Sequence, residues 1–380
     1  MKKTIKIEDF TLLLLTFKSI YSFSSIIYSS VIDNFILIFA MSCFAIVFIK
    51  RKYTYKEFII ILLLGIVLTI SSLRAGMWYM LITYVVAILM SKMDIDRSIS
   101  LIAKVQFWFL MFHMIISIGF YCLGKSGFVV NFYGENRLTL LFTHPNVLSM
   151  LCISLILEWT WLKWDKITIY NIVFIIFIMT LLYFMTKTDA ILIILIVEYA
   201  TWLKNKYINF VINVIAKIGV PIATLICWLI SYIYTNVQGK IGAFVKLLDT
   251  LMSKRISILA MEISMNKIKL FGNGMKTYSG YNFEFGVFGT NAIDNVYYTL
   301  IFFYGFIFII ILSIIFYKLA KLNSCKINFF LTAFVLYGLV EGQIIISLVF
   351  PALLLITFLF KDKKIIIDNL NKKNKKGRII

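Results

Sequence analysis

Residues 50–74 have the sequence KRKYTYKEFIIILLLGIVLTISSLR, and the architecture of the whole chain follows from this pattern. Within it, residues 58–73 contain no charged side chain, whereas four basic residues precede them and Arg74 follows. An uncharged run of this kind approaches the roughly 20 apolar residues that a helix needs to cross a bilayer. Lipid offers the backbone no hydrogen-bond partner, so such a run is expected to be helical.

The same pattern recurs along the chain. Of its 380 residues, 61% are hydrophobic and 15% are charged, against about a quarter charged in soluble domains. We predict an all-α integral membrane protein with about 12 transmembrane helices in a single polytopic domain, residues 1–380. The predicted spans are 10–29, 34–49, 58–73, 77–91, 99–123, 147–161, 167–185, 190–203, 208–234, 296–317, 327–340 and 344–360.

Basic residues predict the orientation. The N-terminus, every second loop and the tail at 361–380 are basic, whereas the short intervening loops are almost free of positive charge. By the positive-inside rule, both termini are cytoplasmic. The net charge of +20 then reflects topology and contact with anionic lipid, and no nucleic-acid partner is expected. The richness in Lys, Ile, Asn and Phe suggests an AT-rich bacterium, and hence its cytoplasmic (inner) membrane.

One long segment, residues 235–295, is predicted to form a large external loop. Apolar residues between 244 and 263 recur at helical spacing. This predicts an amphipathic helix on the outer surface, although a plain packing helix would show the same period. The segment LFGNG at 270–274 follows, where glycine permits a tight turn. Tight hairpins with charged tips are predicted around Lys187 and Glu341, and both tips could line a polar cavity.

The stretch RLTLLFTHPN at 137–146 is the most informative for chemistry. Pro145 suits the first turn of a helix and biases His144 toward an extended conformation, so His144 is predicted at a helix N-terminus, with Asn146 beside it. A histidine there can act as a general base or as a hydrogen-bond donor, and Arg137 can hold phosphate oxygens with two nitrogens. The structural alternatives are a plain helix start and an arginine that extends to headgroups.

A second candidate stretch is NAIDNVYY at 291–298. It lies at the predicted outer start of the tenth span, and Asp294, Asn295 and Tyr297 are its candidate site residues. The structural alternative makes Asp294 the N-cap of the next helix and makes Tyr297 and Tyr298 aromatic residues of the membrane interface.

Four further charged residues lie in the external segments. Arg74, Lys187 and Arg255 could converge with Glu341 on one external cavity, where cations would suit a diphosphate better than a neutral solute. His113, within the fifth span, is predicted to be a packing residue. Lys18, within the first span, is either functional or marks a misplaced boundary. No metal site, cofactor or disulfide framework is expected from the five scattered cysteines and two histidines.

Taken in order, Arg137 and HPN at 144–146, Arg255 and LFGNG at 270–274, then DNVY at 294–297 and YG at 304–305 resemble the bacterial O-antigen and capsular polysaccharide polymerase family, which includes the O-antigen ligases. The resemblance covers the order and topology of nearly the whole chain. Two features depart from it: the glycine often found shortly before the histidine is replaced by Leu140 to Thr143, and Lys187 stands where many relatives have arginine.

This resemblance implies a metal-independent, multi-spanning glycosyltransferase that acts on undecaprenyl-diphosphate-linked oligosaccharide at the outer membrane face. It implies that Arg137, Arg255 and Arg74 hold the diphosphate, and that His144 assists the acceptor hydroxyl or the leaving group. It makes Asp294 a second candidate base. Membrane lipid, a flippase and a chain-length regulator of the same pathway would be its partners.

Three alternatives remain open from the sequence. A ligase of the same family would transfer the finished glycan to another acceptor. A flippase would transport the lipid-linked unit, although transporters usually place polar residues near the bilayer midplane. A scaffold protein would tolerate replacement of Arg137 and His144.

Overall fold

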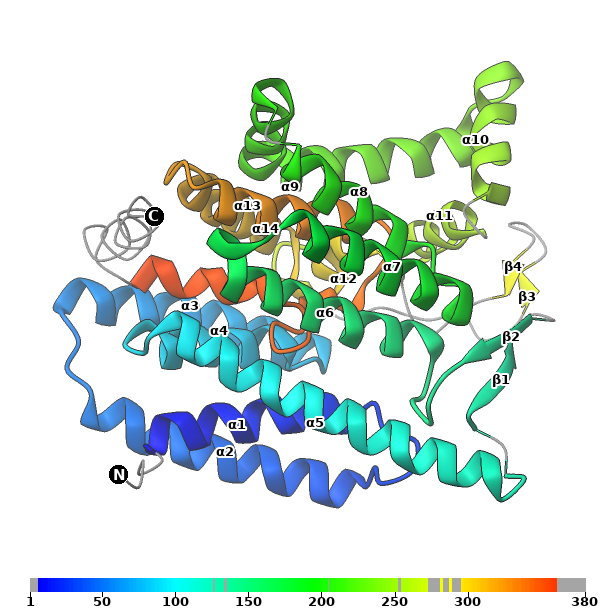
Figure 1. Ribbon diagram of the computed structural model, residues 1–380. Coiled ribbons are helices and arrows are strands. Elements are labelled where there is room, and N and C mark those ends of the chain that lie inside the picture. Colours follow the sequence, from blue (N-terminus) through cyan, green and yellow to red (C-terminus); the bar gives the residue numbers. More distant parts are fainter. Residues whose placement is uncertain are drawn as a thin grey trace.

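The computed structural model describes residues 6–360 except 126, 133–134, 204, 252–253, 273–280, 283–286 and 289–294. The chain is mostly helical (Figure 1). Its first half contains α1 (Ile7–Tyr21), α2 (Ser30–Lys50), α3 (Tyr55–Ala75), α4 (Tyr79–Ser91), α5 (Ile95–Cys122), β1 (Val129–Phe132), β2 (Glu135–Leu138), α6 (Pro145–Lys163), η1 (Trp164–Lys166) and α7 (Ile169–Thr186). The second half contains α8 (Ala190–Trp202), α9 (Lys206–Asn236), α10 (Gly239–Leu251), α11 (Arg255–Met265), β3 (Tyr281–Asn282), β4 (Val287–Phe288), α12 (Val296–Thr299), η2 (Leu300–Tyr304), α13 (Phe306–Ala320), α14 (Cys325–Tyr337), η3 (Gln343–Ile345) and η4 (Pro351–Phe360).

The helices have the length and composition of membrane helices. Within the described residues, six are long and apolar enough to cross a bilayer, namely α2, α3, α5, α6 with η1, α7 and α9. Their outward faces are apolar as well; on α2, for example, Val31, Phe35 and Ile38 are 76%, 69% and 67% exposed. So much exposed apolar surface is rare in soluble proteins and is what lipid contact requires. The chain is therefore an all-α protein of the membrane type.

Helix starts follow from local sequence. At the start of α3, the Thr54 hydroxyl accepts a hydrogen bond from the Glu57 amide over 3.3 Å. In return, the Glu57 carboxylate accepts one from the Thr54 amide over 2.8 Å. This reciprocal capping satisfies two amides that the helix itself leaves unpaired. The helix therefore begins at Tyr55, within the charged stretch that precedes residue 58.

The long helices run side by side, with the β1–β2 hairpin, β3–β4 and α11 at one end of the bundle, here called the hairpin end (Figure 1). The start of α1 and the end of η4 lie at the opposite end. There Arg51 donates to the carbonyls of Ile88 and Leu89 over 3.0 and 2.7 Å and pairs with Glu8 over 3.1 Å. These contacts join α1, α2 and α4 at that end.

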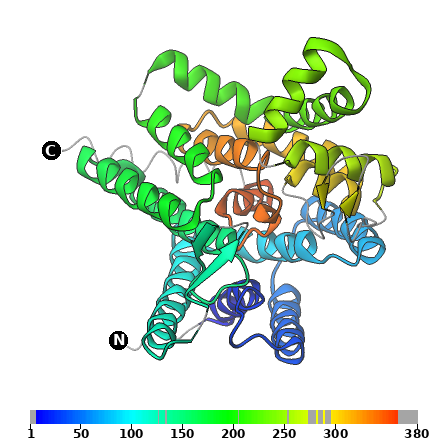
Figure 2. The ribbon, with the colours of Figure 1, turned by 90° about the vertical axis from the view of Figure 1, so that its right-hand side faces the viewer.

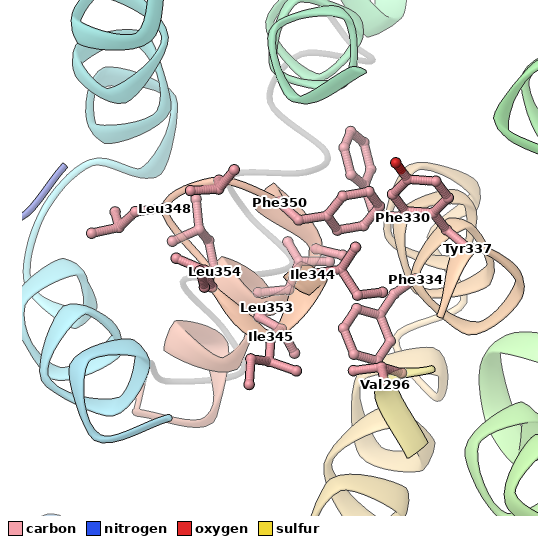
Figure 3. Close-up of a cluster of buried hydrophobic side chains, with 14 of the residues drawn as sticks. Val296, Phe330, Phe334, Tyr337, Ile344, Ile345, Leu348, Phe350, Leu353 and Leu354 are labelled. Atoms are coloured by element: carbon pink, nitrogen blue, oxygen red, sulfur yellow. The ribbon is translucent and has the colours of Figure 1, made fainter. Parts of the chain in front are cut away.

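The C-terminal segment forms the centre of the bundle, as the view along the helices shows (Figure 2). Aromatic residues of α14 pack there against η3, η4 and the irregular chain between them (Figure 3). Phe334, Phe350 and Leu353 are 0 to 1% exposed. Irregular backbone at this depth is tolerated because protein surrounds it on every side.

Three predicted spans are not continuous helices, namely 10–29, where α1 ends at Tyr21, 296–317, and 344–360, which contains irregular chain between η3 and η4. The predicted span 296–317 is interrupted at Gly305, where φ is +91° and a π-helical turn, η2, meets α13. The predicted hairpin around Glu341 is irregular from residue 338, and Glu341 is only 2% exposed, so it is not a charged tip in solvent. Periodicity did not reveal these breaks because the residues around them are as apolar as those of the helices.

The predicted single helix at 244–263 is two helices. They are separated by a turn in which Lys254 adopts a left-handed conformation with φ of +66°. Asp249 holds this turn, because its carbonyl accepts from the Lys254 amide over 2.8 Å and its carboxylate accepts from the Ser257 amide over 2.9 Å. The apolar face of α11, including Ile256 and Leu259, is buried.

Candidate functional site

His144 is the N-cap of α6, as its sequence predicts. Its backbone is extended, with φ of −155° and ψ of 148°, and Pro145 occupies the first helical position. The His144 Nδ1 atom accepts a hydrogen bond from the Asn146 amide over 3.1 Å. Since Nδ1 is the acceptor, the proton of the neutral ring is on Nε2. The geometry therefore favours His144 as a hydrogen-bond donor through Nε2.

A set of polar side chains, here called the His144 cluster, extends from this helix start to the α7–α8 turn. The Thr188 hydroxyl donates to Asn146 Oδ1 over 3.3 Å, and Ser149 Oγ donates to Thr186 or Thr188, at 2.8 and 3.0 Å. Ser149, Thr186 and Thr188 are buried. Single hydroxyls within apolar runs carry no periodic signal, so these residues were missed from the sequence.

Lys187 lies between the two threonines but is directed away from the cluster. Its φ of +53° turns the chain, its side chain is exposed, and its Nζ lies 5.5 Å from the centre of the Phe184 ring. The α7–α8 turn thus contributes hydroxyls to the cluster rather than the predicted cation. A diphosphate-binding role for Lys187 would need a different direction of its side chain.

Arg137 lies in an antiparallel hairpin, β1–β2, that the sequence did not predict. It pairs across the hairpin with Val130, and β2 packs against α7. The Arg137 guanidinium contacts the Glu135 carboxylate over 2.9 Å, and its Nε has no hydrogen-bond partner in the described part of the chain. A phosphate at this position would therefore compete with Glu135 for Nη2, whereas Nε is buried in this structure.

Asn295, rather than Asp294, caps α12; Asp294 lies outside the described residues. The Asn295 side chain accepts from the amides of Tyr297 and Tyr298 over 3.0 and 3.2 Å and donates to the Leu339 carbonyl over 3.1 Å. Tyr297 and Tyr298 are 0% and 1% exposed, so both are buried in the protein and do not fit the alternative interpretation as aromatic residues that face the membrane interface. Tyr297 instead donates to the Val335 carbonyl over 2.6 Å and holds the core together.

The stretches 270–272 and 304–305 pack against each other. The amides of Phe306 and Ile307 donate to the carbonyls of Lys269 and Leu270 over 3.0 and 3.1 Å. A Cβ atom on Gly305 would lie 2.2 Å from the Leu270 carbonyl oxygen, and one on Gly272 would lie 2.4 Å from the Phe303 oxygen. Only glycine permits so close an approach of two backbones. The glycines of the two motifs therefore form one structural unit.

Arg74 and Arg255 lie on separate elements. Arg74 is exposed in the last turn of α3 and makes no ion pair with the described residues. Arg255 is the first residue of α11 and is half-buried. Among the candidate residues in the described part of the chain, hydrogen bonds join His144 to Asn146 and Asn295 to Tyr297, two neighbouring pairs on separate helices. The convergence of the cations and Glu341 on one cavity stays a prediction.

An apolar groove lies between α3, α4, α13 and η4. It is lined by Leu64, Val67, Leu68, Met80, Thr83, Tyr84, Phe308, Ile311, Ile315, Ile356 and Phe360. Arg74 follows Val67 by seven residues, which places it on the same helix face about 10 Å further along. One cation thus lies on the same face of α3, beyond the residues of that helix that line the groove.

A second, smaller pocket lies between α1, α4 and the chain at 346–348. Lys18, Tyr79, Thr83 and Ser347 are among the side chains that line it. Lys18 is 8% exposed and pairs with Asp33 of α2 over 3.4 Å. The buried lysine of the first span is thus neutralised by a residue of the next helix.

A buried amide–carboxyl pair lies on α5 and α6. Gln106 Nε2 donates to Glu158 Oε1 over 3.0 Å and to the Leu348 carbonyl over 2.8 Å. Ser154 donates to the same carboxyl oxygen over 3.3 Å. Glu158 Oε2 and Gln106 Oε1 have no partner among the residues whose placement is described. Both side chains were missed because a single polar residue in an apolar run does not indicate what it faces.

No group of three His, Cys, Asp or Glu side chains that could hold a metal ion occurs in the described ranges. Comparison of the chain with family models, with curated proteins and with solved structures finds no match.

Proposed function

We propose that this protein polymerises lipid-linked oligosaccharide repeat units at the outer face of a bacterial cytoplasmic membrane. About twelve spans would then place both termini in the cytoplasm and the hairpin end outside, with α10 on the outer surface. The donor would be the growing glycan on undecaprenyl diphosphate, and the acceptor another lipid-linked repeat unit. The order of motifs along the chain is the starting point for this proposal.

The observation that carries the proposal is the apolar groove with Arg74 on the same face of α3, beyond the residues of that helix that line it. A polyprenyl diphosphate is a long hydrocarbon with an anionic head, so the groove suits its tail and a guanidinium suits its phosphates. The groove lining is apolar apart from the hydroxyls of Thr83 and Tyr84. A polar solute would gain little from such a lining.

The chemistry needs few protein groups. An acceptor hydroxyl oxygen forms the new bond to the anomeric carbon, the bond from that carbon to the diphosphate breaks, and the diphosphate leaves with the electron pair. The hydroxyl proton passes to a base, for which Asp294 is the candidate. His144, as a donor through Nε2, would stabilise the leaving phosphate oxygen together with Arg137 and Arg74.

The test is the length of glycans from cells whose own copy is deleted and replaced by wild type, Arg74→Ala, Arg137→Ala or His144→Ala, with membrane levels matched. Single repeat units in place of the ladder in the deletion and in all three variants would support the proposal. A ladder that persists in the deletion strain would refute it. A ladder that persists only in the variants would refute the site. Leu73→Ala is the control, since this exposed neighbour of Arg74 has no charge.

Transport of the same lipid-linked unit is the second candidate, and a specific observation favours it. The irregular chain at 338–350, with Gln106 bonded to the Leu348 carbonyl, resembles the interrupted helices of transporters. If so, the deletion would leave lipid-linked units on the cytoplasmic side, where an externally added, impermeant glycosidase cannot reach them. Units accessible to that enzyme in the deletion strain would refute transport.

A further inference from the structure

The loop before His144 contains two consecutive residues in the left-handed conformation. Leu140 and Leu141 have φ of +49° and +59°, and both side chains are buried. Residues other than glycine adopt this conformation only when their surroundings enforce it. The loop lies close to the position at which the resembling family often has glycine. Here the leucines adopt the backbone conformation that glycine adopts most easily.

Contacts from the first loop of the chain hold this segment. The amide and hydroxyl of Ser25 both donate to the Leu141 carbonyl, the amide over 3.0 Å. The Thr143 amide donates to the Phe23 carbonyl over 3.0 Å. The α1–α2 loop thus fixes the segment on the two residues that flank Phe142.

His113 of α5 provides the third contact. It is fully buried, its ring stacks on that of Phe142 with 4.2 Å between centres and 11° between planes, and its Nδ1 lies 3.0 Å from the Leu140 carbonyl oxygen. A carbonyl only accepts, so Nδ1 carries the proton and donates it. His113 Nε2 has no partner in the described residues. Among the residues that the structure describes, the one hydrogen bond of the His113 side chain is therefore made to the strained loop.

We propose that His113 is a positioning residue, which holds Leu140 and Leu141 in the left-handed conformation and so sets the place of His144, three residues further on. The consequence for glycan synthesis rests on the proposed function. The contact by which His113 holds residues 140–141 in the left-handed conformation, here called the clamp, does not rest on the proposed function, because it concerns only the loop. His113 lies on α5, a continuous helix of 28 residues, so its side chain is a rigid support for the loop.

Hydrogen exchange of the full-length purified protein tests the clamp. His113→Phe keeps a flat ring against Phe142 and removes the donor, whereas His113→Asn keeps a donor at the position of Nδ1. In His113→Phe, the amides of Leu141 and Thr143 should exchange roughly tenfold faster, because a buried carbonyl loses its partner. His113→Asn should restore most of the protection. Ser117→Ala, which removes a buried hydroxyl one turn along α5 that has no partner in the described part of the chain, should leave the exchange of these amides unchanged.

A second pair of variants tests the strain. Leu140→Gly and Leu140→Ala remove the same buried side chain, but only glycine adopts positive φ without cost. Exchange in the glycine variant should be about five- to thirtyfold slower than in the alanine variant. Equal amide exchange rates in Leu140→Gly and Leu140→Ala would refute the claim that the loop is strained. Amide exchange in His113→Phe at the wild-type rate would refute the clamp.

Glycan length in cells that express the same variants tests the positioning. His113→Phe should shorten the ladder and His113→Asn should restore it. If His144→Ala abolishes the ladder but His113→Phe leaves it intact, His113 does not position His144. If His144→Ala itself leaves the ladder intact, the proposed site fails, and the exchange data still decide the clamp.

Discussion

Replacing Gly305 with alanine tests the packing of 270–272 against the interrupted helix. Gly305 has φ of +91° and ψ of 166°, a conformation found almost only in glycine. A Cβ atom there would lie 2.2 Å from the Leu270 oxygen and 2.3 Å from the Gly272 nitrogen. These neighbours are backbone atoms, so a side-chain rotation cannot relieve the overlap.

The loss of stability is the sum of two effects. The backbone conformation costs alanine about 1 to 2 kcal/mol. Moving the two backbones apart breaks the hydrogen bonds from Phe306 to Lys269 and from Ile307 to Leu270, at about 1 kcal/mol each or somewhat more. Gly305→Ala should therefore lower the free energy of unfolding by about 3 to 5 kcal/mol.

Two other glycines provide matched controls. Gly76 has φ of +66° with no atom within 4 Å of an added Cβ, so Gly76→Ala should cost only about 1 kcal/mol. Gly119 is inside α5 with the same open space, and Gly119→Ala should be neutral or stabilising by up to about 1 kcal/mol. Unfolding in mixed micelles, followed by circular dichroism, gives all three values. Equal losses for Gly305→Ala and Gly76→Ala would refute the close packing.

Three further predictions use the same unfolding assay. Thr188→Val should lower the free energy of unfolding by about 1 to 2 kcal/mol, because Ser149 and Asn146 lose a shared partner. Thr188→Ser keeps the hydroxyl and should be close to wild type. Equal stability of the two variants would contradict the His144 cluster. Glu158→Gln should stay within about 1 kcal/mol of wild type, since it keeps the acceptor for Gln106. Glu158→Ala should lower the free energy of unfolding by about 3 kcal/mol. Equal losses in the two variants would contradict the hydrogen bond between Gln106 and Glu158. Burial raises the pKa of Glu262, in α11, to about 7. The folded state therefore retains a proton that the unfolded state releases from about pH 4.5, so stability should fall as pH rises from there through 7. Glu262→Gln should remove this dependence, and a dependence that persists would assign it to another group.

The helical segments were largely predictable, whereas their interruptions were not. Each of the twelve predicted apolar runs contains helix in the structure. The first is shorter than predicted, because α1 ends at Tyr21 and the chain then turns toward the loop of Leu141. The break at Gly305 depends on residues 269–272 lying across it, more than thirty residues away along the chain. Local sequence contains no record of such a neighbour.

The candidate site was predictable in part. Pro145 predicted the start of a helix, and His144 is the N-cap of that helix in the structure. The polar neighbours around His144 were not predictable from the sequence. Thr188 lies in the α7–α8 turn, far along the chain, and the charge of the adjacent Lys187 made that residue the candidate in its place. His113 was predicted to be a packing residue, and its stacking on Phe142 agrees with this. Its hydrogen bond to Leu140 was not foreseen, since nothing in a single apolar helix indicates a strained loop beside it.

By itself, the sequence determined the all-α membrane class and the approximate position of each helix. The physical reason is that lipid offers the backbone no hydrogen-bond partner, so an apolar segment in the bilayer must pair its own amides and carbonyls, which a helix does. Only the tertiary structure decided which polar groups meet: Thr188 with Asn146, Gln106 with Glu158, and His113 with Leu140. Hydrogen bonds depend on distances of about 3 Å and on direction, and these arise only when helices distant in the chain pack at one rotation and one depth.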